Sequence, residues 1–320
     1  MATCSVQSDA WAGAGAPVLL AHGGAWDIPD AVCADHEADL QAALTEGRAV
    51  LADGGSALEA VVAVVASMEA SGTFDAGHGA MLRRDGSVEL DAGLMDGSTL
   101  DYGAVVGVRR FGQPVRLAHR IVQRSDGQAR ILTREGAEAF AEAEGFPLVD
   151  NETLICAREH RRYEQLRAAA AFHTSHSFLQ APRGTVGCVA RDRAGRLAAA
   201  TSTGGTPFAP PGRVGDSPLP GAGFYANAHA AAGATGWGEA ITAMRNTGRA
   251  VDAVAAGASP EDVLRERLEQ MHARITNHNG NGATGGLILL DEAGGGAWAF
   301  TTPRMARGGW RVGEAIWTAI

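Results

Sequence analysis

The feature of this sequence that most constrains its fold is the way its strands are expected to pair. Stretches of apolar residues joined by short glycine-containing turns at 77–97, 185–203 and 284–302 are typical of antiparallel hairpins. Segments with helical spacing lie between them, at 31–53, 56–70, 114–124, 133–144, 238–257 and 259–275. The regular strand–helix–strand alternation of a doubly wound parallel sheet is absent. The pattern therefore predicts an α+β sandwich in which antiparallel sheets are covered by helices.

Two further strands and two helix starts support this arrangement. Residues 17–26 and 103–110 are mostly apolar stretches of strand length and are expected to form strands. Ser56 and Glu59 have the spacing of a capping box, and Ser259 followed by Pro260 is typical of the first turn of a helix.

Two segments are expected to lie outside this core. The first sixteen residues read as a loose tail. Residues 160–184 are charged, then alanine-rich, then polar, and contain a proline near their end, which predicts a frayed helix end and a mobile linker. The linker divides the chain into two halves.

Composition excludes several functions. The 320 residues are 46% hydrophobic, which is ample for a large core, and the net charge is −9 without a basic cluster, so nucleic acid is not an expected partner. The sequence contains no lysine, which excludes a lysine Schiff base and a serine–lysine dyad. No apolar run approaches the roughly 20 residues of a membrane span.

The four cysteines stand far apart, at Cys4, Cys33, Cys156 and Cys188, without metal-ligand spacing. Together with the absence of a signal-peptide pattern, this favours reduced thiols in a cytoplasmic protein.

The sequence gives little support for a nucleotide-binding or metal-binding function. No phosphate-binding glycine motif follows a strand. His160, His173 and His176 lie in or near the linker without carboxylate companions, so we interpret them as solvated residues rather than metal ligands. His22 lies at a glycine turn after a buried strand and fits either a structural or a functional role, the structural one being favoured.

The Gly184–Thr185 pair carries the strongest chemical hypothesis. An N-terminal threonine combines a nucleophilic hydroxyl with a free α-amine, whose pKa of about 7.7–8.0 suits a general base near neutral pH. An internal threonine gains that amine only if the chain is cut before it. Gly184, the residue before the cut, suits such a reaction because the peptide bond must distort and glycine has the widest range of backbone conformations. Thr185 opens an expected core strand directly after the linker. Glycine–threonine pairs are common, however, so an ordinary strand residue remains an alternative at this point.

Motifs in order along nearly the whole chain narrow the choice. The sequence resembles the plant-type asparaginases and isoaspartyl aminopeptidases, which are N-terminal-nucleophile hydrolases. The matching stretches are "HGGAW" (22–26), "FDAGHGA" (74–80), "ELDAGLMDG" (89–97), "GAVVGV" (103–108), "GTVGCVA" (184–190), "LAAATSTGG" (197–205), "PGRVGDSPLPGAGFYA" (211–226) and "ATGWGE" (234–239).

The resemblance implies a single four-layer αββα domain covering residues 1–320. The precursor is expected to cut itself between Gly184 and Thr185 into an α chain, 1–184, and a β chain, 185–320. The pair of processed precursors usual in the family implies a dimer of αβ units.

The resemblance also assigns roles. Thr185 is the expected nucleophile, with Thr203 beside it, and Thr235 and Gly236 match the oxyanion hole. Substrate-binding positions are Arg213 for an α-carboxylate, Asp216 for an α-ammonium, Gly238 and Asp75. No cofactor is implied for catalysis. A structural sodium ion is implied, held through the backbone of Met68, Glu69, Ser71, Phe74, Ala76 and His78.

Three positions depart from the family pattern and bear on the substrate. Asp75 stands where the family usually has asparagine, and is expected to add negative charge near Thr185. His78 replaces a small or apolar residue in the sodium loop. Trp237 replaces a small residue and is expected to narrow the pocket.

The leading hypothesis is a self-cleaving amidohydrolase for β-aspartyl peptides, with L-asparagine as a lesser substrate. Two alternatives stay open: the same machinery acting on a glycosylated asparagine or a modified β-aspartyl compound, and a scaffold that binds without processing itself.

Overall fold

The computed structural model describes residues 4–13, 15, 17–124, 127–168 and 184–320, which build two β-sheets. The larger sheet has, in order, β13 (Trp317–Ala319), β12 (Arg304–Arg311), β2 (Val18–Trp26), β6 (Val186–Arg191), β7 (Leu197–Thr203), β3 (Leu90–Asp96), β4 (Tyr102–Val108) and β5 (Ile131–Thr133). The smaller has β1 (Gln7–Trp11), β11 (Gly296–Phe300), β10 (Gly285–Asp291), β9 (Ala230–Gly236) and β8 (Phe224–Ala226).

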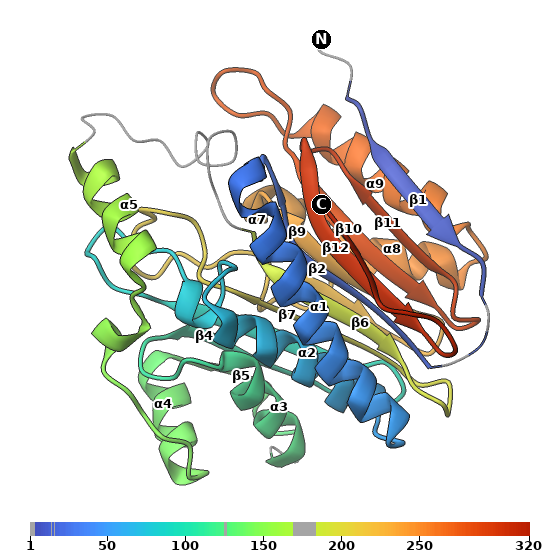
Figure 1. The fold of residues 1–320 in the computed structure, drawn as a ribbon, viewed down its shortest axis with the longest axis horizontal. Helices are drawn as coiled ribbons and strands as arrows, with labels where there is room; N and C mark the ends of the chain where they lie inside the picture. Colours follow the sequence, from blue (N-terminus) through green and yellow to red (C-terminus); the bar gives the residue numbers. More distant parts are fainter. Residues whose placement is uncertain (1–3, 14, 16, 125–126, 169–183) are drawn as a thin grey trace.

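The sheets and helices form four layers (Figure 1). Helices α1 (Asp30–Ala52), α2 (Ala57–Ser71) and α3 (Pro114–Arg124) cover the larger sheet, and α8 (Asn246–Ala255) and α9 (Pro260–Arg274) cover the smaller one. Helices α4 (Arg134–Ala143), α5 (Ala157–Ala168) and α7 (Gly238–Met244) and the short 3-10 helices η1 (Gly77–Gly79) and η2 (Asn151–Leu154) complete the fold. The predicted αββα sandwich is confirmed.

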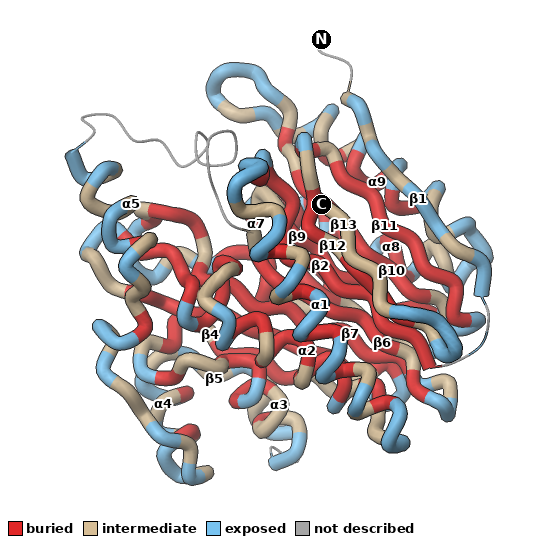
Figure 2. Tube along the Cα trace, viewed as in Figure 1, coloured by how far each residue is buried: buried red, intermediate tan, exposed pale blue. Residues whose placement is uncertain are grey.

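Three apolar clusters fill the spaces between the layers. One lies between α1–α3 and the larger sheet, a second between the smaller sheet and α7–α9, and a third between the two sheets, where Leu20, Val189, Phe224 and Ile288 pack. Figure 2 shows the strands buried along most of their length, while exposed residues lie on the outer helices and loops. The larger sheet is covered on both faces, which explains why β2 is buried at all nine positions.

The helix signals in the sequence have mixed outcomes. Ser56 and Glu59 form the complete capping box at the start of α2. Ser259 is at the N-cap of α9 and Pro260 is its first residue, but the Ser259 side chain makes no capping hydrogen bond. The helix expected over 238–257 is two helices, because Arg245 adopts a left-handed conformation with φ 51° between them.

Three predicted segments differ from the structure. Of the hairpin expected over 77–97, only an isolated bridge between Leu82 and Val88 forms around the turn, because β3 pairs instead with β4 and β7. The N-terminal tail contains β1, which pairs antiparallel with β11, so the prediction of a loose tail is wrong for this part. In the predicted linker, 160–168 belong to α5, and 169–183 lie outside the described residues.

Candidate active site

The β6–β7 hairpin places Thr185 beside Thr203. These strands pair antiparallel with Val186 opposite Ser202, so the residue before β6 lies opposite the last residue of β7. The Thr185 hydroxyl donates a hydrogen bond to Oγ1 of Thr203 at 3.1 Å, and both residues are buried. Two hydroxyls from one hairpin thus meet in a site shielded from most solvent.

The backbone before Thr185 lies against Gly24, near the end of strand β2. Gly24 has φ 103°, a conformation that favours glycine, and a Cβ at Gly24 or at Gly184 would collide with the backbone of the other. The two glycines therefore allow the close approach of β2 to the Gly184–Thr185 peptide. Sequence reasoning did not assign Gly24 to the site, although the quoted "HGGAW" motif contains it.

Asp75 lies on the far side of Thr203. Its Oδ1 accepts a hydrogen bond from the Met81 N–H at 3.0 Å, and its Oδ2 accepts one from the Thr203 hydroxyl at 3.4 Å. The side chain is almost fully buried, and burial raises the pKa of the Asp75 carboxyl to about 7, with a further rise from the nearby charge of Glu159. The negative charge expected at this position is consequently only partial near neutral pH.

The remaining predicted site residues line the same cavity as Thr185. Thr235 and Gly236 end β9, Gly238 begins α7, and Arg213 and Asp216 come from the loop between β7 and β8. The Thr235 hydroxyl is buried and has no hydrogen-bond partner among the described residues. Gly236 has φ 131°, which a side chain would strain. All the predicted catalytic and substrate-binding positions therefore meet in one cavity.

Arg213 and Asp216 present opposite charges at this cavity. A Cβ added to Gly238 would lie 2.9 Å from Nη2 of Arg213 and 2.9 Å from Oδ1 of Asp216, so glycine is needed for both groups to converge there. Burial raises the pKa of the Asp216 carboxyl to about 7. Arg213 donates two hydrogen bonds to the Glu239 carboxylate, from Nε at 2.9 Å and from Nη2 at 2.8 Å. This contact with Glu239 was not foreseen from the sequence.

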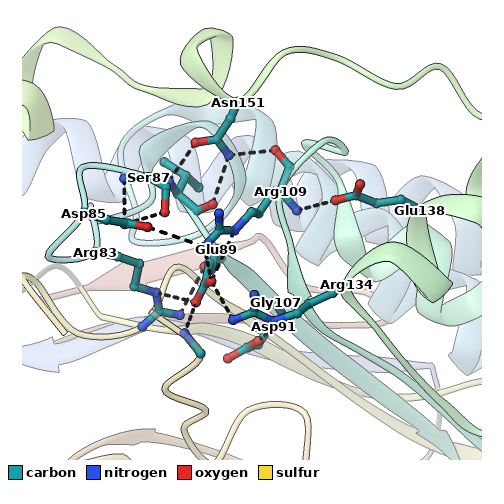
Figure 3. A network of polar contacts seen from close by, with 12 residues as sticks. Arg83, Asp85, Ser87, Glu89, Asp91, Gly107, Arg109, Arg134, Glu138 and Asn151 are labelled. Atoms are coloured by element: carbon teal, nitrogen blue, oxygen red, sulfur yellow. Dashed lines mark hydrogen bonds and ion pairs between the residues drawn. The ribbon is translucent and has the colours of Figure 1, made fainter. Parts of the chain in front are cut away.

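A buried carboxylate, Glu89, holds the loop that carries Arg213. Its oxygens accept the Gly212 N–H at 2.7 Å and contact three arginines at 2.7–3.3 Å, namely Arg83, Arg109 and Arg134. Figure 3 shows these groups converging on Glu89 from separate segments. The Arg83 guanidinium also lies against Gly205, which lines the cavity near Thr203. This network was not predicted, because its members are far apart in the sequence.

The last turn of α2 and the loop after it form the segment where the sequence resemblance implies a sodium ion. Backbone oxygens of Glu69 and Phe74 lie close to the Cα atoms of Gly77 and Gly79, in space that a Cβ would fill. Carbonyl oxygens are hard donors that suit such a cation. Arg158 of α5 donates to the neighbouring carbonyls of Gly72, at 2.8 Å, and Gly79, at 3.4 Å.

Three residues singled out from the sequence are not among those that line the cavity. Trp237 packs against the apolar cluster of α7–α9 and lies beside Glu239, the partner of Arg213, so the narrowing of the pocket by its indole stays a prediction. His78 is exposed. His22 is fully buried, and burial lowers its pKa to about 3, which keeps it neutral. Its ring fills the space left by the missing side chain of Gly187.

Of the three histidines expected in or near the linker, one lies in a described helix. His160 lies in α5, and His173 and His176 lie outside the described residues. Within the described residues, histidine, cysteine and carboxylate side chains form no group of three or more that could hold a metal ion.

In the part of the chain that the structure describes, no helix combines the length and apolar character needed to cross a membrane.

Comparison with known proteins matches this geometry to a family. The family model described as asparaginase matches residues 15–320. An isoaspartyl peptidase of Salmonella typhimurium is 41% identical over 95% of this chain and 98% of its own. A plant-type L-asparaginase of Pyrobaculum calidifontis is 39% identical over 92% and 97% of the two chains, and an isoaspartyl peptidase/L-asparaginase of Xenopus laevis is 37% identical over 91% of each. With the sandwich fold and a family match over nearly its whole length, the chain belongs to the asparaginase family.

Proposed function

We propose that the protein is a self-cleaving threonine amidohydrolase that hydrolyses β-aspartyl (isoaspartyl) peptides, with L-asparagine as a lesser substrate. The observation that carries the proposal is the buried Thr185–Thr203 hydroxyl pair in a cavity that also holds Arg213 and Asp216. The names of the similar proteins support the substrate class.

The first reaction is the cut between Gly184 and Thr185. The Thr185 hydroxyl attacks the Gly184 carbonyl carbon, its proton passes to the leaving nitrogen, and the C–N bond breaks to give an ester. Water then hydrolyses the ester, which leaves a Gly184 carboxylate and a free Thr185 amine. The amine can accept the hydroxyl proton in later turnovers, which the internal peptide nitrogen cannot do.

The second reaction is hydrolysis of the substrate amide. Arg213 binds the α-carboxylate and Asp216 binds the α-ammonium, which points the side-chain carbonyl at Thr185. Thr185 Oγ1 attacks this carbonyl, and Thr235 with Gly236 stabilises the oxyanion. The amine leaves with the proton held by the Thr185 amine. Water attacks the acyl-enzyme and releases aspartate.

We also propose a structural sodium ion near the site and an assembly of the two cleaved chains. The backbone carbonyls of Met68, Glu69, Ser71, Phe74, Ala76 and His78 would hold a structural sodium ion that takes no part in the chemistry. Chains 1–184 and 185–320 would remain together as one αβ unit, and two such units would form a dimer in the cytoplasm.

A denaturing gel tests the self-cleavage. The 32.9 kDa chain should separate into bands of about 19 and 14 kDa, in proportion to 184 and 136 of its 320 residues. Thr185→Ala should stay intact. A single full-length band from wild-type protein after long incubation at neutral pH would refute the cleavage.

The substrate is tested on cleaved protein. Aspartate release should be faster from β-Asp-Leu or β-Asp-Arg than from asparagine. If none of the three is hydrolysed, the isoaspartyl assignment fails and a different aspartyl amide must be sought.

A further inference from the structure

The two charged groups assigned to substrate binding are close together but do not pair with each other. Arg213 and Asp216 flank the same position beside Gly238. Among the described residues, the ion pair made by Arg213 is with Glu239, and Oδ2 of Asp216 is buried without a hydrogen-bond partner. Opposite charges in a buried site attract strongly, so this separation needs a cause.

Glu239 supplies that cause. Its two oxygens take Nε and Nη2 of Arg213 in a bidentate contact, which fixes the plane of the guanidinium as well as its position. The Glu239 side chain is 55% exposed, whereas that of Arg213 is 14% exposed, so the glutamate holds the arginine from the solvent side. Nη1 of Arg213 donates no hydrogen bond to any described residue and stays available to a ligand.

We propose that Glu239 is a positioning residue that holds Arg213 away from Asp216 and so keeps both halves of the zwitterion-binding subsite open. The inference rests on the proposed function, because that function gives Arg213 and Asp216 their roles. If the glutamate charge is removed, Arg213 turns toward the unpartnered oxygen of Asp216. The closed pair then occupies the groups that an α-carboxylate and an α-ammonium require.

The variant Glu239→Gln keeps the shape of the side chain and removes its charge. We expect KM for β-Asp-Leu, and the dissociation constant of L-aspartate measured by calorimetry, to rise about 10- to 100-fold. The turnover number should change less than about threefold, because Glu239 does not touch the reacting atoms. Fragment formation on a gel should be unchanged.

A matched control is Glu266→Gln. Glu266 is an exposed glutamate on α9 that also pairs with an arginine, Arg267, at 3.1 Å. This variant should leave both constants at their wild-type values.

A second variant separates positioning from general damage. In Glu239→Gln combined with Asp216→Asn, Asp216 can no longer trap Arg213, and Asp91 remains as a nearby negative charge in both variants. Binding of succinate, which has carboxylates but no ammonium, should therefore recover relative to Glu239→Gln alone. Damage to the fold of the loop would instead weaken succinate binding further.

The possible results decide the two proposals separately. A wild-type protein that cleaves neither itself nor β-Asp-Leu would refute the proposed function, while L-aspartate binding to wild type and Glu239→Gln would still decide the inference. Unchanged or tighter L-aspartate binding in Glu239→Gln would overturn it, since Glu239 would then be inert or a competitor of the substrate. Failure of the double variant to recover succinate binding would also overturn it.

Discussion

Asp75 and Asp216 give the cavity two carboxyls whose charge changes near neutral pH. Each is buried, and burial raises its pKa to about 7 because the charged form loses its hydration. The groups facing Asp216 are Arg213, which favours its charge, and Glu239 and Asp91, which oppose it. A site that binds an ammonium through such a carboxyl should depend strongly on pH.

L-aspartate and succinate should respond to pH in opposite directions. Because the pKa of Asp216 is about 7, its charged form dominates above that pH and its neutral form below it. L-aspartate needs the charge for its ammonium, so its inhibition constant should rise as pH falls from 8 to 6. Succinate is repelled by the charge of Asp216, so its inhibition constant should decrease as the pH falls from 8 to 6. Competition assays against β-Asp-Leu measure both.

Comparing the two ligands isolates Asp216 from other groups that titrate in the cavity. The charge of Asp75 acts on both ligands in the same sense, because both carry carboxylates. In Asp216→Asn the difference between the two pH profiles should disappear. Parallel profiles in the wild-type protein would contradict the assignment of Asp216 to the ammonium.

Glu89 is the point where separate elements are tied to the Arg213 loop. It precedes β3, and its partners come from the turn before it, the end of β4, the start of α4 and Gly212 (Figure 3). The side chains of Glu89 and Arg83 are fully buried, whereas Arg109 and Arg134 are partly exposed. Removing the glutamate would leave a buried guanidinium without its charge partner.

Glu89→Ala should therefore lower the free energy of unfolding by about 3–5 kcal/mol, as is typical when one member of a buried ion pair is removed. Glu164→Ala, which breaks the pair between Glu164 and Arg167 on α5, whose side chains are 45% and 63% exposed, should cost at most about 1 kcal/mol. Urea unfolding in the uncut Thr185→Ala background measures both without chain dissociation. A loss at Glu89 no larger than that at Glu164 would show that the network adds little.

The elements that the sequence predicts well are those with local signals. The 185–203 hairpin and the capping box of α2 are specified by residues close in sequence, and both form. The hairpin around Asp85 fails because the partners of β3 come from β4 and from β7, about a hundred residues away. Arg245 breaks a helix although arginine is a good helix former, so tertiary packing overrides propensity there.

In the site too, contacts between residues close in sequence can be predicted, whereas long-range contacts cannot. Thr185 and Thr203 are neighbours in one hairpin, and their contact can be expected from the strand register alone. Glu239 directly follows Gly238, a predicted substrate-binding position, yet its contact with Arg213 depends on how α7 meets the loop between β7 and β8. Long-range contacts of this kind carry no periodicity that a single sequence reveals.

At the scale of the whole molecule, the two sheets approach closely where a glycine of the larger sheet faces a large side chain of the smaller one. The Cα of Gly93 on β3 faces the ring of Phe224 on β8, and a Cβ there would collide with that ring. Phe224 is fully buried in the cluster between the sheets, so its ring has no free space to move into. Gly93 thus sets part of the spacing of the sandwich.

Gly93→Ala and Gly136→Ala make the same chemical change in opposite surroundings. At Gly93 the added methyl group overpacks the space between the sheets and should cost about 1–3 kcal/mol of unfolding free energy. Gly136 lies in α4 with nothing within 4 Å of an added Cβ, so alanine should stabilise the protein by about 0.5–1 kcal/mol. Urea unfolding in the Thr185→Ala background measures both. Equal shifts of the two midpoints would mean that intrinsic glycine-to-alanine propensity dominates and that the sheets can separate without cost at Phe224.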